Sequence, residues 1–210
     1  MPFQENKVEL VGWYGGDEVH ALSAWTSTSR QLTDEKRGRI PNLLRMLAEN
    51  GHETPFEKSS LHFLVTVDTS VHIQLLKHRI GVSINGESAR YKELKDDKYY
   101  LPRDWPLEEQ AKYVAFMEDA LRRYHDTLEC LVKDGMDRKR AKESARFYLP
   151  YGNQITMDVM FNWRSFNHFL GLRMKPDAQK EIRDLATAML ELVRGIEGEP
   201  FKHTIEAFGY

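Results

Sequence analysis

The chain has 210 residues, enough for one sizeable hydrophobic core, and its 30 basic and 32 acidic side chains leave a formal net charge of -2. This balance excludes a general attraction to nucleic acid or to a membrane surface, so any anion must be bound by a local cluster of cations. The single cysteine, Cys130, excludes an internal disulfide and a cysteine-based zinc site and favours a reduced, cytoplasmic setting. The N-terminal residues lack a signal-peptide pattern, and no apolar run is long enough to span a membrane.

The first half of the chain predicts short strands that alternate with helices. Strands are predicted at residues 7–13, 61–67 and 98–101. Helices are predicted at residues 41–50, with Pro41 in the first turn, and 71–78, with Ser70 as the N-cap. Between the second helix and the third strand, residues 80–91 read as a polar loop with two glycines.

From residue 107 onward the patterns are helical. Helices are predicted at residues 107–134, 137–149, 156–172 and 176–196. Asp137 is the expected N-cap of the second of these, and Gly135 ends the first. Taken together, the elements predict an α/β fold of the α+β type: a single mixed domain over residues 1–210, with a small sheet and a helical C-terminal half.

The segment KHRIGVSINGESARY, residues 77–91, concentrates cations and hydrogen-bond donors around a flexible backbone. Gly81 and Gly86 permit positive φ and a close approach of a ligand to backbone amides. Ser88 and Arg90 would offer a hydroxyl and a planar guanidinium to phosphate oxygens. On spacing alone, an anion site and an ordinary solvated loop are equally compatible with this pattern.

The predicted helix before this loop would place Gln74, Lys77 and His78 on one face. The sequence contains neither the dinucleotide fingerprint nor a P-loop, and its eight histidines show no metal-ligand spacing, so no metal site is expected. A phosphate, if bound, would be held by arginines and loop amides.

Two further segments carry polar residues in unusual surroundings. Arg146 stands beside a small alanine in ARFYLP, residues 145–150. Arg164 and His168 are one helical turn apart in the aromatic segment 161–173. Taken singly, a salt-bridged surface arginine and a satisfied core histidine are the simpler interpretations.

Four motifs together resemble one known family. In chain order they are NGHETPFEK at 50–58, KHRIGVSINGESARY at 77–91, ARFYLP at 145–150 and FNWRSFNHFLGLR at 161–173. The resemblance is to the flavin-dependent thymidylate synthases and runs from about residue 24 to 208. It implies a homotetramer with active sites built from several subunits. It also implies nucleotide biosynthesis, the methylation of dUMP to dTMP, with methylenetetrahydrofolate as carbon donor, NADPH as electron source and FAD as hydride carrier.

The resemblance also carries over site residues, position by position. Positions that match flavin contacts are Thr54, His78, Arg79, Asn162, Arg164 and His168, with His52 and Glu57 in the same motif and Ser27 in a weaker alignment. Positions that match dUMP contacts are Gln74, Lys77, Ser88, Ala89, Arg90, Arg146 and Arg173. Lys77 and Glu87 fall where either flavin or nucleotide is bound. Arg173 matches the residue that polarises the uracil, and is the expected catalytic residue.

Three departures from the family pattern keep other activities open. Lys77 stands in place of an arginine, Asp177 in place of a histidine, and the spacer from Arg79 to Ser88 is one residue longer, so that either Gly86 or Glu87 takes the place of the family glutamate. A related reaction on another pyrimidine nucleotide, a hydroxymethylation, and an inactive nucleotide-binding relative remain alternatives.

The chain lacks an evident thiolate nucleophile. Cys130 is predicted on a polar helix face near a helix C-terminus, where the dipole disfavours the thiolate. The remaining way to activate uracil is electrostatic, by a guanidinium such as Arg173 in a water-poor pocket.

Overall fold

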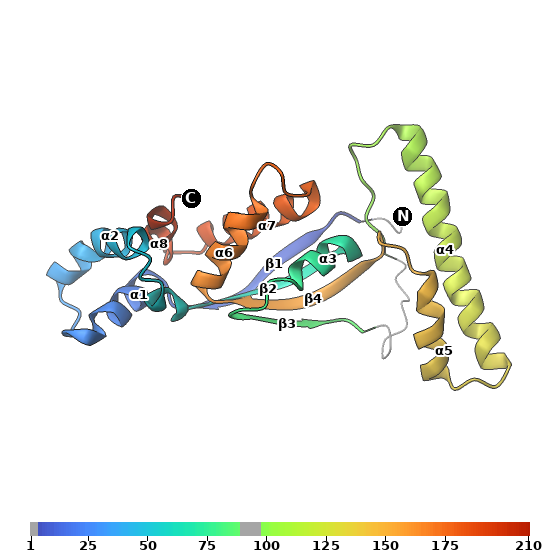
Figure 1. Ribbon diagram of the computed structural model, residues 1–210, viewed down its shortest axis with the longest axis horizontal. Coiled ribbons are helices and arrows are strands. Elements are labelled where there is room, and N and C mark those ends of the chain that lie inside the picture. Colours follow the sequence, from blue (N-terminus) through green and yellow to red (C-terminus); the bar gives the residue numbers. More distant parts are fainter. Residues whose placement is uncertain (1–3, 89–97) are drawn as a thin grey trace. The chain divides into compact units, whose positions relative to one another are not determined.

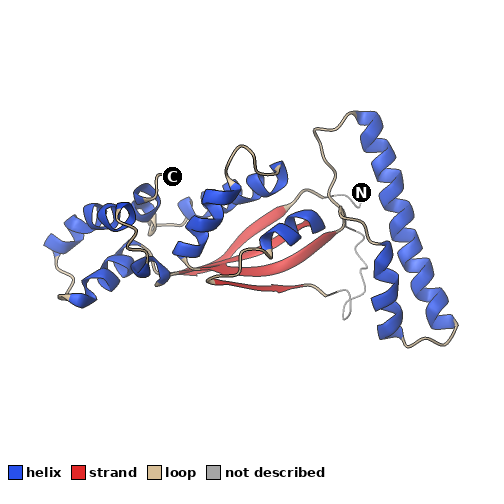
Figure 2. Cartoon of the chain, viewed as in Figure 1, coloured by secondary structure: helices blue, strands red, loops and turns tan. Residues whose placement is uncertain are grey.

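The computed structural model describes residues 4–88 and 98–210 and confirms a mixed α/β fold (Figures 1 and 2). Four strands form one sheet in the order β1-β2-β4-β3. The strands are β1 (Lys7–Tyr14), β2 (Ser60–Asp68), β3 (Val82–Gly86) and β4 (Gln154–Phe161). The helices are α1 (Asp17–Ala24), α2 (Asp34–Glu49), α3 (Thr69–Leu75), α4 (Leu107–Lys133), α5 (Arg138–Ala145), α6 (Trp163–Arg173), α7 (Lys180–Arg194) and α8 (Lys202–Ala207). Among the described residues, no helix has the length and apolar character that a membrane span requires.

The contacts within the chain group it into two compact units. The first unit comprises Met1–Lys7, Thr66–Leu75 and Asn85–Met157, and the second comprises Val8–Val65, Leu76–Ile84 and Asp158–Tyr210. Each unit has its own buried residues and is described by itself. The single domain over residues 1–210 stays a prediction.

In the first unit, α4 and α5 pack side by side (Figure 1). Tyr124 and Leu128 of α4 are buried against Ala141 and Ala145 of α5, because small alanines let the two helices approach closely. The Asp137 carboxylate accepts hydrogen bonds from the backbone N–H groups of Lys139 and Arg140, which confirms the predicted N-cap of α5.

In the second unit, aromatic side chains of α6 pack on the buried face of the sheet. Phe166 stacks on Phe63 of β2, with ring centroids 5.7 Å apart, and Phe169 lies 5.4 Å from Phe161 of β4. All four rings are fully buried. This aromatic core fixes the position of α6, so the polar residues on its other faces are held on a rigid element.

The predicted helix at 156–172 is wrong in its first half. Residues 154–161 form β4, in which the alternate residues Met157, Val159 and Phe161 are buried. This period of two belongs to a strand, and α6 begins only after Asn162. The strand predicted at 98–101 is also wrong, since Tyr99 makes only an isolated bridge to Asn153.

The segment around α3 differs from prediction in three ways. Its N-terminus is capped by Asp68, whose carboxylate accepts from the Val71 N–H at 3.1 Å, rather than by Ser70. The helix ends at Leu75, so Lys77 and His78 do not share a helical face with Gln74. The loop predicted at 80–91 contains β3.

Two helices begin at other residues than predicted, and two short helices were missed. The helix predicted at 41–50 begins at Asp34, with Thr33 as N-cap, and carries Pro41 inside it. The last long helix begins at Lys180 rather than at Pro176. Short helices α1 and α8 have no strong periodic signal, and the sequence patterns missed both.

Candidate functional site

The start of α6 and the segment before β3 are joined by close polar contacts. Asn162 is the N-cap of α6 and accepts a hydrogen bond from the Ser165 N–H at 2.9 Å. The Ser165 hydroxyl donates to the Ile80 carbonyl at 2.8 Å. Gly81 has φ +67°, and a Cβ there would lie 2.2 Å from Ser165 Oγ and 2.7 Å from Asn162 Nδ2. The glycine is therefore required at this position by both its φ and its packing.

These residues border an open cavity of about 450 Å³ in the second unit. Its lining residues are Glu53, Glu57, Ile80, Gly81, Asn162, Arg164, Ser165, Asn167 and His168. Glu57, Asn162, Arg164 and His168, all predicted on the flavin side, are thus brought together. The sequence patterns missed Glu53, Ser165 and Asn167, although the Asn162-x-x-Ser165 spacing is a readable N-cap signal.

Arg164 in this cavity is held between two carboxylates. Its Nε lies 2.7 Å from Glu53 Oε2, and its Nη1 lies 2.6 Å from Glu57 Oε1. The hydrogen bond to Glu57 and the charge of Glu53 raise the pKa of Arg164, so it stays cationic. The simple interpretation of Arg164 as a salt-bridged, half-exposed arginine is correct, and the salt bridges lie within the cavity. His168 is exposed, so its interpretation as a core histidine is wrong.

A second cluster joins the other end of α6 to the segment after α3. The Nε–H of Arg173 donates to Nε2 of His78 at 3.0 Å. His78 is buried, and its ring meets Phe169 edge-on, with centroids 5.1 Å apart. Burial, reinforced by the positive charges of Arg173 and His168, lowers the pKa of His78 to about 4. The imidazole is therefore neutral at pH 7, with its proton on Nδ1.

The other residues predicted on the flavin side are exposed. His52 lies just before the short 3-10 segment Thr54–Glu57, and Thr54 is its first residue. Ser27 ends another such segment, and its hydroxyl donates to the Ala24 carbonyl. Lys77 and Arg79 are exposed on either side of the buried His78.

The first unit holds the remaining residues predicted to bind nucleotide. Gln74 is half-buried on α3, and Arg146 is exposed at the start of the 3-10 segment Arg146–Tyr148. The Glu87 carboxylate accepts from the Thr156 N–H at 3.1 Å, and Ser88 is half-buried. Ala89 and Arg90 lie outside the described residues.

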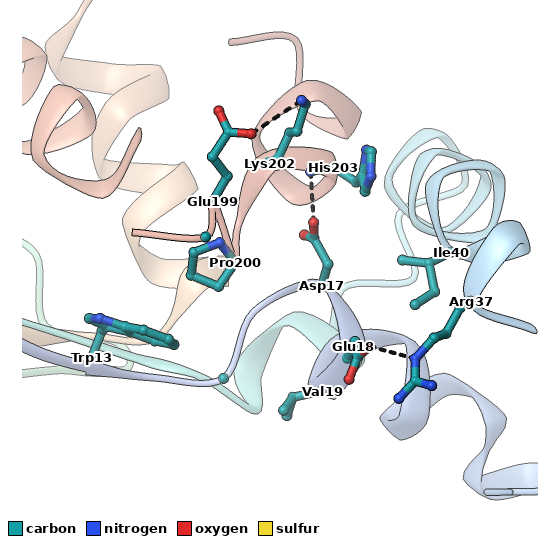
Figure 3. Close-up of a pocket in the computed structure, with 12 residues that line it drawn as sticks. Trp13, Asp17, Glu18, Val19, Arg37, Ile40, Glu199, Pro200, Lys202 and His203 are labelled. Carbon is teal, nitrogen blue, oxygen red and sulfur yellow. Dashed lines mark hydrogen bonds and ion pairs between the residues drawn. The ribbon is translucent and has the colours of Figure 1, made fainter. Parts of the chain in front are cut away.

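A different cavity, of about 510 Å³, lies between β1, α1 and α8 of the second unit (Figure 3). Its charged groups have partners within the fold. Buried Asp17 accepts from the backbone N–H groups of His203 and Thr204, and Arg37 pairs with Glu18 at 2.9 Å. Burial raises the pKa of Asp17, against the lowering effect of these hydrogen bonds. Because its charged groups are already paired or hydrogen-bonded, this cavity offers a charged ligand little.

Neither cavity is lined by Cys130 or by a group of metal ligands among the described residues. Cys130 is exposed, and its Sγ lies 3.8 Å from the Asp134 carboxylate. No histidine, cysteine and carboxylate groups within the described residues are arranged to hold a metal ion.

Comparisons with known proteins agree on one family. The model of a family described as thymidylate synthase complementing protein matches residues 9–197. The flavin-dependent thymidylate synthase of Pseudothermotoga lettingae is 31% identical over 199 residues, which cover 90% of this chain and 85% of the relative. That of Nitratidesulfovibrio vulgaris is 34% identical, over 87% of this chain and 75% of the relative. Among solved structures, the UMP/dUMP methylase PolB from Streptomyces cacaoi, bound with 5-Br dUMP, superposes with a TM-score of 0.81 at 27% identity, covering 99% of this chain and 97% of PolB.

Proposed function

The chain belongs to the family of flavin-dependent thymidylate synthases, and we propose that it catalyses the reductive methylation of dUMP to dTMP. The proposed co-substrates are methylenetetrahydrofolate as carbon donor and NADPH as reductant, with FAD as cofactor. A homotetramer in the cytoplasm, with active sites shared between subunits, is part of the same proposal. The match of the family model to residues 9–197 is the observation that carries it.

We place the flavin at the cavity beside α6. Arg164 with Glu53 and Glu57 brings one positive and two negative charges, so this triad suits ribose hydroxyls better than a phosphate. The side-chain amide of Asn167 and the 91% exposed side chain of Ile80 supply polar and apolar contacts at its rim. His52, Thr54, Arg79 and Ser27 extend this proposed flavin side. FAD, when bound, supplies the redox chemistry.

Cations and polar side chains are proposed to hold the nucleotide. Arg146, Gln74 and Ser88 are assigned to dUMP, and the resemblance adds Ala89 and Arg90. Lys77 acts as a point charge on a phosphate of nucleotide or flavin, and Glu87 is assigned to the same surroundings.

Arg173 is proposed to activate the uracil. Its guanidinium would stabilise negative charge on the uracil ring and so make the ring carbon nucleophilic. Since Cys130 is exposed with a carboxylate beside it, covalent activation by a thiolate has no support among the described residues.

A second candidate is methylation of UMP as well as dUMP. The structural similarity to a UMP/dUMP methylase favours it, at a TM-score of 0.81 over 99% of the chain. The two substrates differ only in the ribose 2′-hydroxyl, so they separate cleanly in an assay.

The test is release of tritium from 5-labelled dUMP and, in parallel, from 5-labelled UMP, with the folate donor, FAD and NADPH present. Release from dUMP with formation of dTMP supports the main proposal, and comparable release from UMP supports the second. A protein that binds both nucleotides and releases tritium from neither is an inactive relative. Analysis of the product by mass separates methylation from hydroxymethylation.

A further inference from the structure

His78 and Arg173 form a contact between a buried neutral ring and a guanidinium. His78 is 7% exposed, and its ring and that of Phe169 meet in an edge-to-face arrangement that holds the imidazole in place. Nε2 of His78 lies 3.0 Å from Nε of Arg173. The two residues are 95 positions apart in sequence, and both belong to the second unit.

The chemistry of the pair defines which atom carries the proton. Arginine has only donors, so His78 Nε2 must accept and the ring proton must lie on Nδ1. The charged and titratable groups that face His78 are Arg173 and His168 of α6, and in its own segment Lys77 and Arg79 flank it. Burial of the ring, Arg173 and His168 disfavour the imidazolium and lower the pKa of His78.

We infer that His78 is a positioning residue for Arg173, which orients the guanidinium through its Nε–H. An arginine side chain that is free to rotate loses conformational entropy when it adopts one orientation on the reacting ring. A rigid acceptor at Nε sets that orientation in advance. This inference rests on the proposed role of Arg173 in activating uracil. It differs from a role of His78 in flavin binding alone, which would change FAD affinity and leave the methylation step unaltered.

The test compares two substitutions of His78. His78→Gln places an amide oxygen near the position of Nε2 and keeps the acceptor, whereas His78→Phe keeps the ring and removes it. We expect His78→Phe to slow single-turnover oxidation of the reduced enzyme by nucleotide plus folate donor about tenfold or more, and His78→Gln to restore most of the rate. FAD affinity and flavin reduction by NADPH are measured for both variants, so that any loss of flavin binding is separated from a slower methylation step. Should His78→Phe not fold, His78→Asn, whose amide is too short to reach Arg173, replaces it.

A double-mutant cycle isolates the contact. In the background of Arg173→Lys, His78→Phe should have no further effect on the methylation step, because lysine lacks the Nε–H of the guanidinium. Effects that multiply would overturn the inference. His125→Gln, a half-buried histidine of α4 outside the site, is the matched control for loss of an imidazole.

Nuclear magnetic resonance of the histidine rings gives a readout that needs no turnover. We expect His78 in the Nδ1–H form at pH 7, and its protonation only near pH 4. An Nε2–H form would overturn the inference whatever the activity. Wild-type protein that methylates neither nucleotide would overturn the proposed function, whereas an active enzyme with His78→Phe at the wild-type rate would overturn only the role of His78.

Discussion

The second unit contains two buried histidines in different chemical surroundings, and the comparison separates a folding network from a candidate site. Near α8, His20 contacts the Thr204 hydroxyl at 3.0 Å, and that hydroxyl donates to Asp17. Near α6, His78 accepts from the half-buried cation Arg173. Both pKa values are lowered by burial, to about 3 for His20 and about 4 for His78.

The partners decide what each histidine can do. The hydrogen bonds of His20 lead through Thr204 to Asp17, which accepts from backbone N–H groups at the start of α8. This network therefore stabilises the packing of α8 against α1. The partner of His78 is a long cationic side chain at the end of α6, which can act on a ligand. A lowered histidine pKa therefore does not identify a site by itself. The identity of the hydrogen-bonded partner is the useful criterion.

The largest expected effect belongs to the α6 site. Arg173→Lys should still bind FAD and accept hydride from NADPH, but lose about two or more orders of magnitude in the methylation step, because lysine lacks the planar guanidinium. Arg146→Lys, in contrast, should mainly raise the nucleotide KM, because a phosphate contact acts on ground and transition states alike. Single-turnover oxidation of reduced enzyme measures the step. If Arg173→Lys carried out the methylation step at the wild-type rate, Arg173 would not be the group that activates the uracil.

Acid should destabilise the protein through both histidines. Each takes up a proton more readily in the unfolded chain, with a pKa of 6.5, than in the fold, so stability is present above pH 6.5 and falls as the pH drops toward 4 and 3. At pH 5 the loss from His20 alone is about 2 kcal/mol. Asp17, whose pKa is raised, offsets part of it. Urea unfolding at several pH values measures how the free energy of unfolding depends on pH. This dependence should be weaker in His20→Phe, and an unchanged dependence would contradict a lowered pKa of His20.

Asp17→Ala should destabilise the fold without changing the chemistry. It removes the acceptor of two backbone N–H groups and of the Thr204 hydroxyl, at a cost of about 1–2 kcal/mol. Glu18→Ala, which loses only an exposed ion pair with Arg37, is the matched control and should cost little. Thermal unfolding and the methylation rate per folded enzyme are the measurements. A slower methylation step in folded Asp17→Ala would mean that the two regions are coupled.

Lys77 should show a modest effect on binding. It is exposed beside His78, so Lys77→Ala should raise the nucleotide KM several-fold, while Lys77→Arg keeps the charge and is tolerated. Steady-state kinetics with varied nucleotide measure this. An unchanged KM in Lys77→Ala would count against a phosphate contact.

The smallest effect is expected at Cys130. Because its thiol is exposed near a carboxylate, Cys130→Ser should retain near-normal turnover. Loss of several orders of magnitude in kcat with the fold intact would require a thiolate mechanism in place of the electrostatic one.

The sequence by itself determined the features that depend on near neighbours. Alternation predicted β1 and β2, the long apolar stripe predicted α4, and Asp137 was recognised as an N-cap. The positive φ that the sequence permits at Gly81 is present, at +67°. The family motifs named Arg164, His168 and Asn162, which the fold does gather around one cavity.

Only the tertiary structure decided what these residues contact. The Arg164–Glu57 and His78–Arg173 pairs join residues 107 and 95 positions apart, and Asp17 reaches Thr204 across 187. Such contacts leave no local period in the sequence. The strand β4 shows the same limit, since its residues can be read as the first turns of a helix until pairing within the sheet and burial of alternate side chains select the extended form.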